Sequence, residues 1–100
     1  MTEIAQSPAG GLILPSVLDL VAASDLLAAF QSHRGHPLEV DGSDVQRLGG
    51  QCLQVLLAAR AAWAADDQTF MLENFSDEFM ATLDLLGVTP QALTYRKELA

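Results

Sequence analysis

The sequence predicts an α/β fold in which a small mixed β-sheet is covered by about three to four helices. Short strand-like segments occur at residues 3–5, 12–14, 37–41 and 69–72. Between them lie longer segments whose apolar residues recur every three or four positions, as in amphipathic helices. No internal repeat or low-complexity tract competes with this alternation of strands and helices.

The first helix is expected to begin near residue 20, with Asp19 as its N-cap, and to end before Gly35 and Pro37. Its apolar face is formed by Ala22, Leu26, Ala29, Phe30 and His33. The strand that follows, at residues 37–41, alternates apolar with acidic side chains.

A second helix is expected from Gly49 or Gly50 to about Ala65. One apolar stripe of this helix consists of Cys52, Val55, Leu56, Ala59 and Trp63, and a second consists of Leu53, Leu57 and Ala64 on nearly the opposite side. A helix that is apolar on two sides needs two surfaces against which to pack.

The last helix is expected to follow Ser76, a good N-cap, and to end at Gly87 and Pro90. Its predicted apolar face consists of Phe79, Leu83 and Leu86. Residues 91–100 carry no clear pattern.

Composition limits the function. Lys and Arg number 5 against 13 Asp and Glu, and the net charge of -8 makes nucleic acid and anionic membranes unexpected partners. The one cysteine excludes an intramolecular disulfide, and every apolar stretch is shorter than the roughly 20 residues needed to cross a bilayer. We therefore expect one cytoplasmic domain over residues 1–100, without membrane insertion.

The residues that could carry chemistry have simpler interpretations. His33 and His36 flank a loop and lack further ligands for zinc. Asp66 and Asp67 mark a solvated helix exit, and Cys52 lies on a core stripe as a buried thiol. The sequence thus predicts no catalytic residues, no metal site and no cofactor.

The Gly49-Gly50 pair precedes a strongly apolar helix. Two interpretations remain open. The glycines can expose the first helix amides to an anion or to a partner's backbone, or they can serve only to make a tight turn.

The segment "LEVDGSDVQRLGGQCLQVLLAA" resembles the central signature of the STAS domain, the fold of bacterial anti-anti-sigma factors. In that pattern a strand ends in Asp-x-Ser, and an Asp-Ser-Ser-Gly or Asp-Thr-Ser-Gly turn leads to Leu and an apolar helix. The matching residues are Asp41, Ser43, Val45, Leu48, Leu53, Val55 and Leu56. With "LPSVLDLVAASDLLAAF" upstream and "FMLENFSDEFMATLDLLGV" downstream, the resemblance covers residues 12–88.

One departure from the family pattern affects regulation. Gly49, Gly50 and Gln51 replace the Asp and the phosphorylatable Ser or Thr of the turn, and Cys52 replaces its glycine. No phosphorylation is therefore expected at the start of the helix. Ser43 matches the strand-end serine, which is expected to form hydrogen bonds with turn amides.

At a finer level the chain resembles small stand-alone STAS proteins associated with bacterial chemotaxis. The resemblance implies a non-catalytic interaction module or regulator in chemotaxis-type or partner-switching signal transduction, whose partner is a kinase, a response regulator or an anti-sigma-like protein. The candidate partner-binding residues are Ser43, Gly49, Gly50, Gln51, Leu53, Gln54 and Leu57. Whether Leu53 and Leu57 form an exposed patch or are covered by the same chain is left open, as is homo-oligomerisation.

Two alternatives remain. The chain could be the cytoplasmic STAS subunit of a phospholipid ABC transporter and bind an ATPase subunit through the same surface. It could instead be an enzyme or an ancient nucleotide-binding domain. Titration calorimetry with millimolar ATP or GTP tests this alternative, and the absence of heat would leave it without support.

Overall fold

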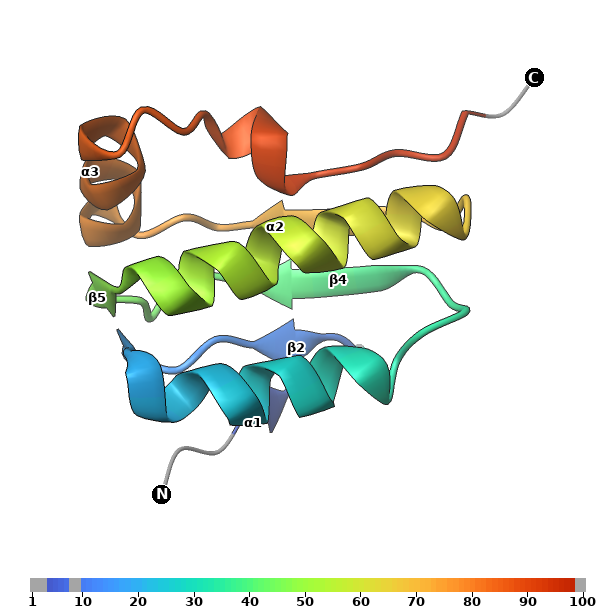
Figure 1. Ribbon diagram of the computed structural model, residues 1–100, viewed down its shortest axis with the longest axis horizontal. Helices are drawn as coiled ribbons and strands as arrows, with labels where there is room; N and C mark the ends of the chain where they lie inside the picture. Colours follow the sequence, from blue (N-terminus) through green and yellow to red (C-terminus); the bar gives the residue numbers. More distant parts are fainter. Residues whose placement is uncertain (1–3, 8–9, 99–100) are drawn as a thin grey trace.

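The computed structural model describes residues 4–7 and 10–98, with the two longest helices side by side in front of a β-sheet (Figure 1). The sheet has the strand order β1-β2-β4-β6. Its strands are β1 (Ala5–Gln6), β2 (Leu12–Ile13), β4 (Leu38–Asp41) and β6 (Phe70–Glu73). Strand β1 is antiparallel to β2, whereas β4 runs parallel to both β2 and β6, which confirms the mixed sheet.

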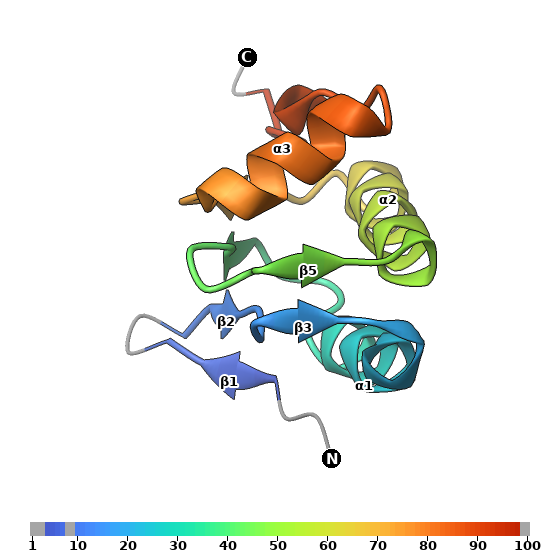
Figure 2. The same cartoon turned by 90° about the vertical axis from the view of Figure 1, so that its left-hand side faces the viewer.

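A second, two-stranded parallel sheet pairs β3 (Val17–Leu18) with β5 (Arg47–Leu48). Figure 2 shows these strands beside the beginnings of helices α1 (Leu20–Gln31) and α2 (Gly50–Ala65). The sequence analysis missed this sheet because strands of two residues are too short to show a period.

The helices begin where the sequence predicts. The Asp19 carboxylate accepts a hydrogen bond from the Ala22 amide at 3.1 Å, at the start of α1. The Ser76 hydroxyl accepts one from the Phe79 amide at 3.0 Å, at the start of α3 (Asp77–Leu85). Helices α1 and α2 lie on the same side of the main sheet. Helix α3 lies near the end of the molecule at which α1 and α2 begin (Figure 2).

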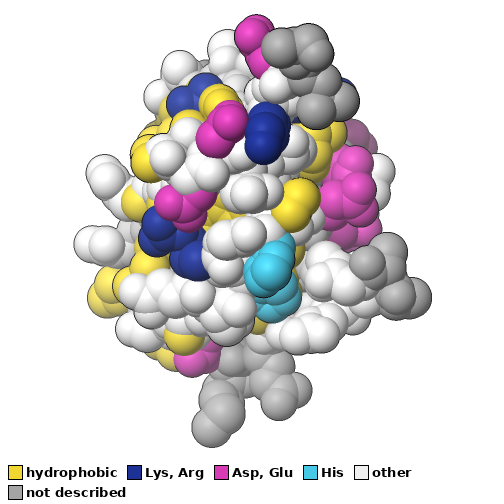
Figure 3. Space-filling model, turned by 90° about the vertical axis from the view of Figure 1, so that its right-hand side faces the viewer, with side chains coloured by type: hydrophobic (Ala, Val, Ile, Leu, Met, Phe, Trp, Pro, Cys, Tyr) yellow, Lys and Arg dark blue, Asp and Glu magenta, His cyan; other side chains and the backbone are white. Residues whose placement is uncertain are grey.

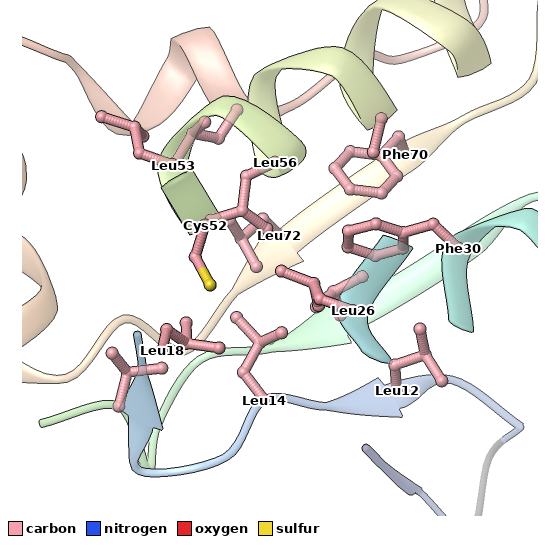
Figure 4. Close-up of a cluster of buried hydrophobic side chains, with 14 of the residues drawn as sticks. Leu12, Leu14, Leu18, Leu26, Phe30, Cys52, Leu53, Leu56, Phe70 and Leu72 are labelled. Atoms are coloured by element: carbon pink, nitrogen blue, oxygen red, sulfur yellow. The ribbon is translucent and has the colours of Figure 1, made fainter. Parts of the chain in front are cut away.

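The core lies between the main sheet and the helices, as the close-up in Figure 4 shows. Phe30, Trp63 and Phe70 form an aromatic cluster with ring centroids 5.4 to 6.2 Å apart. The Trp63 indole donates a hydrogen bond to the His36 carbonyl at 2.7 Å. The buried apolar residues are Leu12, Leu14, Leu18, Ala22, Leu26, Phe30, Leu38, Val40, Val45, Cys52, Leu53, Leu56, Ala59, Trp63, Phe70, Leu72, Phe79, Leu83 and Leu93.

Other expectations need correction. Leu86 was expected on the core face, but α3 ends at Leu85 and Leu86 is 48% exposed as the C-cap. His33 was expected on the apolar face of the first helix, but α1 ends at Gln31 and His33 follows it, half-buried. The predicted strand at residues 3–5 falls partly outside the described residues, and β1 begins at Ala5.

The C-terminal segment, for which the sequence showed no pattern, contributes to the core. It forms the 3-10 helix η1 (Pro90–Leu93), whose Leu93 is buried. Tyr95 then pairs with Phe70 through two backbone hydrogen bonds, of 2.7 and 2.9 Å. This pairing covers the β6 edge of the main sheet.

Trp63→Phe should lower the free energy of unfolding by about 1 to 3 kcal/mol, because it leaves a cavity and removes the donor to the His36 carbonyl. Urea denaturation followed by circular dichroism measures the change. Leu85→Ala is the control, since Leu85 is 85% exposed, and should shift stability by less than about 0.5 kcal/mol. Equal stability of Trp63→Phe and the unmodified chain would contradict this packing.

Candidate functional site

The start of α2 is held by the segment that leads into α1. The Gly49 amide donates to the Leu18 carbonyl at 2.7 Å, and the Cys52 thiol donates to the Asp19 carbonyl at 3.2 Å. Gly49 is the N-cap of α2 and provides no side-chain hydrogen bond, and the first turn contains no acidic residue. The first amides of α2 are therefore left without a side-chain acceptor, at the partially positive end of a 16-residue helix.

Gly50 is not required by the fold. It is exposed, its φ lies outside the left-handed region, and a Cβ added there would meet no atom within 4 Å. At Gly49 an added Cβ would lie 3.4 Å from the Leu18 carbonyl oxygen. A Cβ would thus fit at Gly50, and glycine leaves the helix start open.

The loop after β4 is held by a carboxylate. Asp41 accepts hydrogen bonds from the Ser43 amide at 2.8 Å and from the Asn74 side chain at 3.4 Å. The carboxylate of Asp41 is thus the acceptor for this turn amide, and hydrogen bonding of the Ser43 hydroxyl to turn amides stays a prediction. Hydrogen bonds from the side chain and backbone of Ser43 hold the pKa of Asp41 below its ordinary value, against a smaller opposing effect of burial.

The second apolar stripe of α2 is largely covered by the same chain. Leu53 is only 8% exposed and Leu57 is half-buried. On this side of α2, the Arg60 guanidinium donates to the Thr94 carbonyl at 3.2 Å, and α2 contacts η1. Of the two interpretations left open by the sequence, coverage holds for Leu53, which is not part of an exposed patch.

Two exposed apolar side chains at the start of α1 were not predicted from the sequence. Leu20 is 71% exposed and Val21 is 70% exposed, in the first turn of α1. Both lie off the face of α1 that carries the buried residues, which is the signal that could have revealed them. Because α1 and α2 begin at the same end of the molecule (Figure 2), we group the accessible residues of the two helix starts as the helix-start platform: Leu20, Val21, Gly49, Gly50, Gln51 and Gln54.

A polar hollow lies between the β4–β5 loop and α3, at the other end of β5 from the start of α2 (Figure 2). It is lined by Ser16, Ser43, Asp44, Val45, Gln46 and Glu78. Ser43 therefore belongs to this hollow rather than to the start of α2. Asp44 and Glu78 give this hollow an acidic character, and the exposed Arg47 of β5 follows it in the chain before the start of α2.

The remaining candidates have structural roles. Cys52 is fully buried, points into the core in Figure 4, and its pKa is raised by burial and by Asp19, which confirms the buried thiol. Asp66 pairs with Arg34 at 2.8 Å at the helix ends, which lowers the pKa of Asp66. Among residues 4–7 and 10–98, no three His, Cys, Asp or Glu are grouped to hold a metal ion.

The fold and this surface define a small α/β domain with an open helix start. A family model described as "Mlab, STAS domain" matches residues 2–94, so the chain belongs to the STAS domain family. The match extends beyond residues 12–88, over which the sequence motifs carried the resemblance. No curated protein and no solved structure gives a significant match.

Family membership supports a regulatory or interaction role, since STAS domains are generally non-catalytic binding modules. In the part of the chain that the structure describes, no helix has both the length and the hydropathy needed to cross a membrane.

Asp41→Asn should lower stability by about 0.5 to 1 kcal/mol at neutral pH, because the charged acceptor of the loop is lost. The pKa of Asp41 is lowered by folding, so its contribution is present at neutral pH and is lost as the pH falls through about 4 and below. Thermal unfolding from pH 7 to pH 3 should therefore show the two proteins converging. A constant difference would contradict this role of the charge.

Gly50→Ala should leave stability unchanged or raise it by up to about 1 kcal/mol, because alanine favours the helix and meets no neighbour. Gly11→Ala is the matched comparison, since its Cβ would lie 2.3 Å from the Glu39 carbonyl oxygen, and it should cost more than about 1 kcal/mol. Denaturant unfolding measures the free energy of unfolding of both variants. A destabilised Gly50→Ala would show that the fold needs this glycine.

Proposed function

We propose that this STAS domain is a non-catalytic interaction module in bacterial signal transduction, and that it binds its partner through the helix-start platform. The partner is a signalling protein such as a kinase, a response regulator or an anti-sigma-like protein, and the chemotaxis-type setting is part of the proposal. The observation that carries it is Gly50, an exposed helical glycine that no packing or backbone constraint requires.

The chemistry of the platform suits a protein partner. Leu20 and Val21 provide apolar contacts, and the flat glycine pair allows close approach of a partner's backbone. Gln51 and Gln54 provide neutral hydrogen-bonding groups at its edge. Asp44 and Glu78 in the polar hollow belong to a chain with a net charge of -8, which would accelerate association with a partner that presents basic side chains.

Binding at the platform is proposed to be independent of phosphorylation at the start of α2. Residues 44–68 contain no Ser, Thr or Tyr, so this stretch cannot accept a phosphoryl group on a hydroxyl. Ser43 precedes this stretch and lines the polar hollow between the β4–β5 loop and α3. The surface would therefore act as a constitutive contact rather than as a partner switch.

The alternative partner is an ATPase subunit of a phospholipid ABC transporter, bound through the same surface. A pull-down from the native cell distinguishes the two. Recovery of an ATPase and a permease would replace the signalling proposal with the transporter alternative, whereas recovery of a kinase or response regulator would support the signalling proposal.

Gly50→Glu should weaken binding of the recovered partner at least about tenfold, because it places bulk and a negative charge at the centre of the platform. Calorimetric titration measures the affinity, and far-ultraviolet dichroism checks that the helices are retained. Leu85→Glu is the control, because it adds the same charge at an exposed position on α3. Unchanged affinity of Gly50→Glu would rule out the platform as the binding surface.

A further inference from the structure

The pairing of Tyr95 with Phe70 covers only part of the β6 edge. On the inner side of β6, the Leu38 amide of β4 donates to the Thr69 carbonyl at 3.0 Å. The backbone groups of successive residues in a strand point to opposite sides of it. The odd-numbered residues of β6 therefore face β4, and the N–H and C=O groups of Phe70 and Leu72 face the outer edge.

The C-terminal segment leaves this edge after one pair. Phe70 and Tyr95 exchange two backbone hydrogen bonds, and continuing their antiparallel register by two residues would place Leu93 opposite Leu72. Leu93 instead lies in η1, which begins at Pro90, so its backbone is not extended (Figure 1). In the part of the chain that the structure describes, no backbone group pairs with Leu72 on this edge.

The unpaired backbone groups of Leu72 are also buried. Leu72 is only 3% exposed, and its side chain lies in the core (Figure 4). Buried backbone N–H and C=O groups are nearly always paired, because burial removes their hydrogen bonds to water. An unpaired donor and acceptor on the same residue of an edge strand match the backbone of a further strand.

A hollow of about 460 Å³ lies beside this unpaired part of the edge. One wall consists of Met71 and Leu72 of β6, with Phe75 just after the strand, and the other wall belongs to the C-terminal segment. The residues of the second wall are Pro90, Gln91, Thr94 and Arg96. Among the residues of both walls, Arg96 is the charged one.

Arg96 has no ionic partner within residues 4–7 and 10–98, and it is exposed. The adjacent Lys97, by contrast, lies 3.8 Å from Asp67, just after α2. Figure 3 shows basic and acidic side chains close together on the side of the molecule where α2 ends. The net charge of -8 opposes a strongly acidic ligand, so we expect a ligand with one carboxylate placed against Arg96.

We propose that the β6 edge beside this hollow is a binding site for an extended peptide segment of another protein, which adds to the main sheet as a strand. The peptide backbone pairs with the N–H and C=O groups of Leu72, and one acidic side chain of the peptide binds Arg96. Main-chain hydrogen bonds provide the affinity in this mode of recognition. This inference does not rest on the proposed function, because the hollow and the helix-start platform share no residue.

Nuclear magnetic resonance of the unmodified chain tests the open edge. Without peptide, the Leu72 amide should exchange with solvent at least about tenfold faster than the hydrogen-bonded Phe70 amide. Selection from a displayed library of random eight-residue peptides supplies the probes, which are synthesised with acetylated and amidated ends so that any carboxylate belongs to a side chain. A selected peptide should shift the Leu72 amide resonance and slow its exchange.

Arg96→Glu should weaken binding of the selected peptide at least about tenfold, because it reverses the charge at the hollow. Arg47→Glu is the matched control, since it makes the same change at an exposed arginine of β5, and it should leave the affinity unchanged. N-methylation of the peptide residue that pairs with Leu72 should abolish binding. Gly50→Glu should bind the peptide normally, which separates this site from the helix-start platform.

Three results would overturn the proposal. The first is a Leu72 amide that, without peptide, is protected as strongly as that of Phe70. The second is a library from which no peptide at millimolar concentration protects Leu72, including one whose peptides perturb only the helix-start platform. The third is equal affinity of Arg96→Glu and Arg47→Glu for a peptide that does protect Leu72.

Discussion

Helix α2 is buried along two sides, and the arrangement of the molecule depends on this. One side packs over the main sheet through Leu56 and Trp63, and the adjoining side, near Leu53 and Arg60, is covered by the returning chain. This double burial fixes the helix axis and its rotation. Only the first turn of α2 and a narrow outer strip of the same helix remain for contact with other molecules.

Each long helix begins shortly after a strand of the small sheet, and this arrangement leaves the first turn of α2 exposed. The hydrogen bond from Gly49 to Leu18 ties the starts of α1 and α2 to the same small sheet. Both helices therefore present their first turns at the same end of the molecule (Figure 2). Exposed residues that are distant in sequence, such as Val21 and Gln51, therefore lie at the same end of the molecule.

Much of the fold could be predicted from the sequence, because long amphipathic helices and capping residues leave clear patterns. Asp19 and Ser76 are N-caps as expected, and α2 covers the predicted range. The small sheet could not be predicted, since it is held by tertiary hydrogen bonds between strands of two residues, and η1 could not, since four residues are too few to show a period. The candidate site was found only in part, because the burial of Leu53 depends on where the C-terminal segment returns.

The central claim is that a partner docks on the helix-start platform, and hydrogen exchange measures this most directly. Amide exchange of the chain would be compared with and without the partner recovered from the native cell. The account predicts slower exchange on binding in the peptides that contain residues 19–22 and 49–54, with little change in α3. Protection confined to α3 or to the open side of the main sheet, with these two segments unchanged, would contradict it.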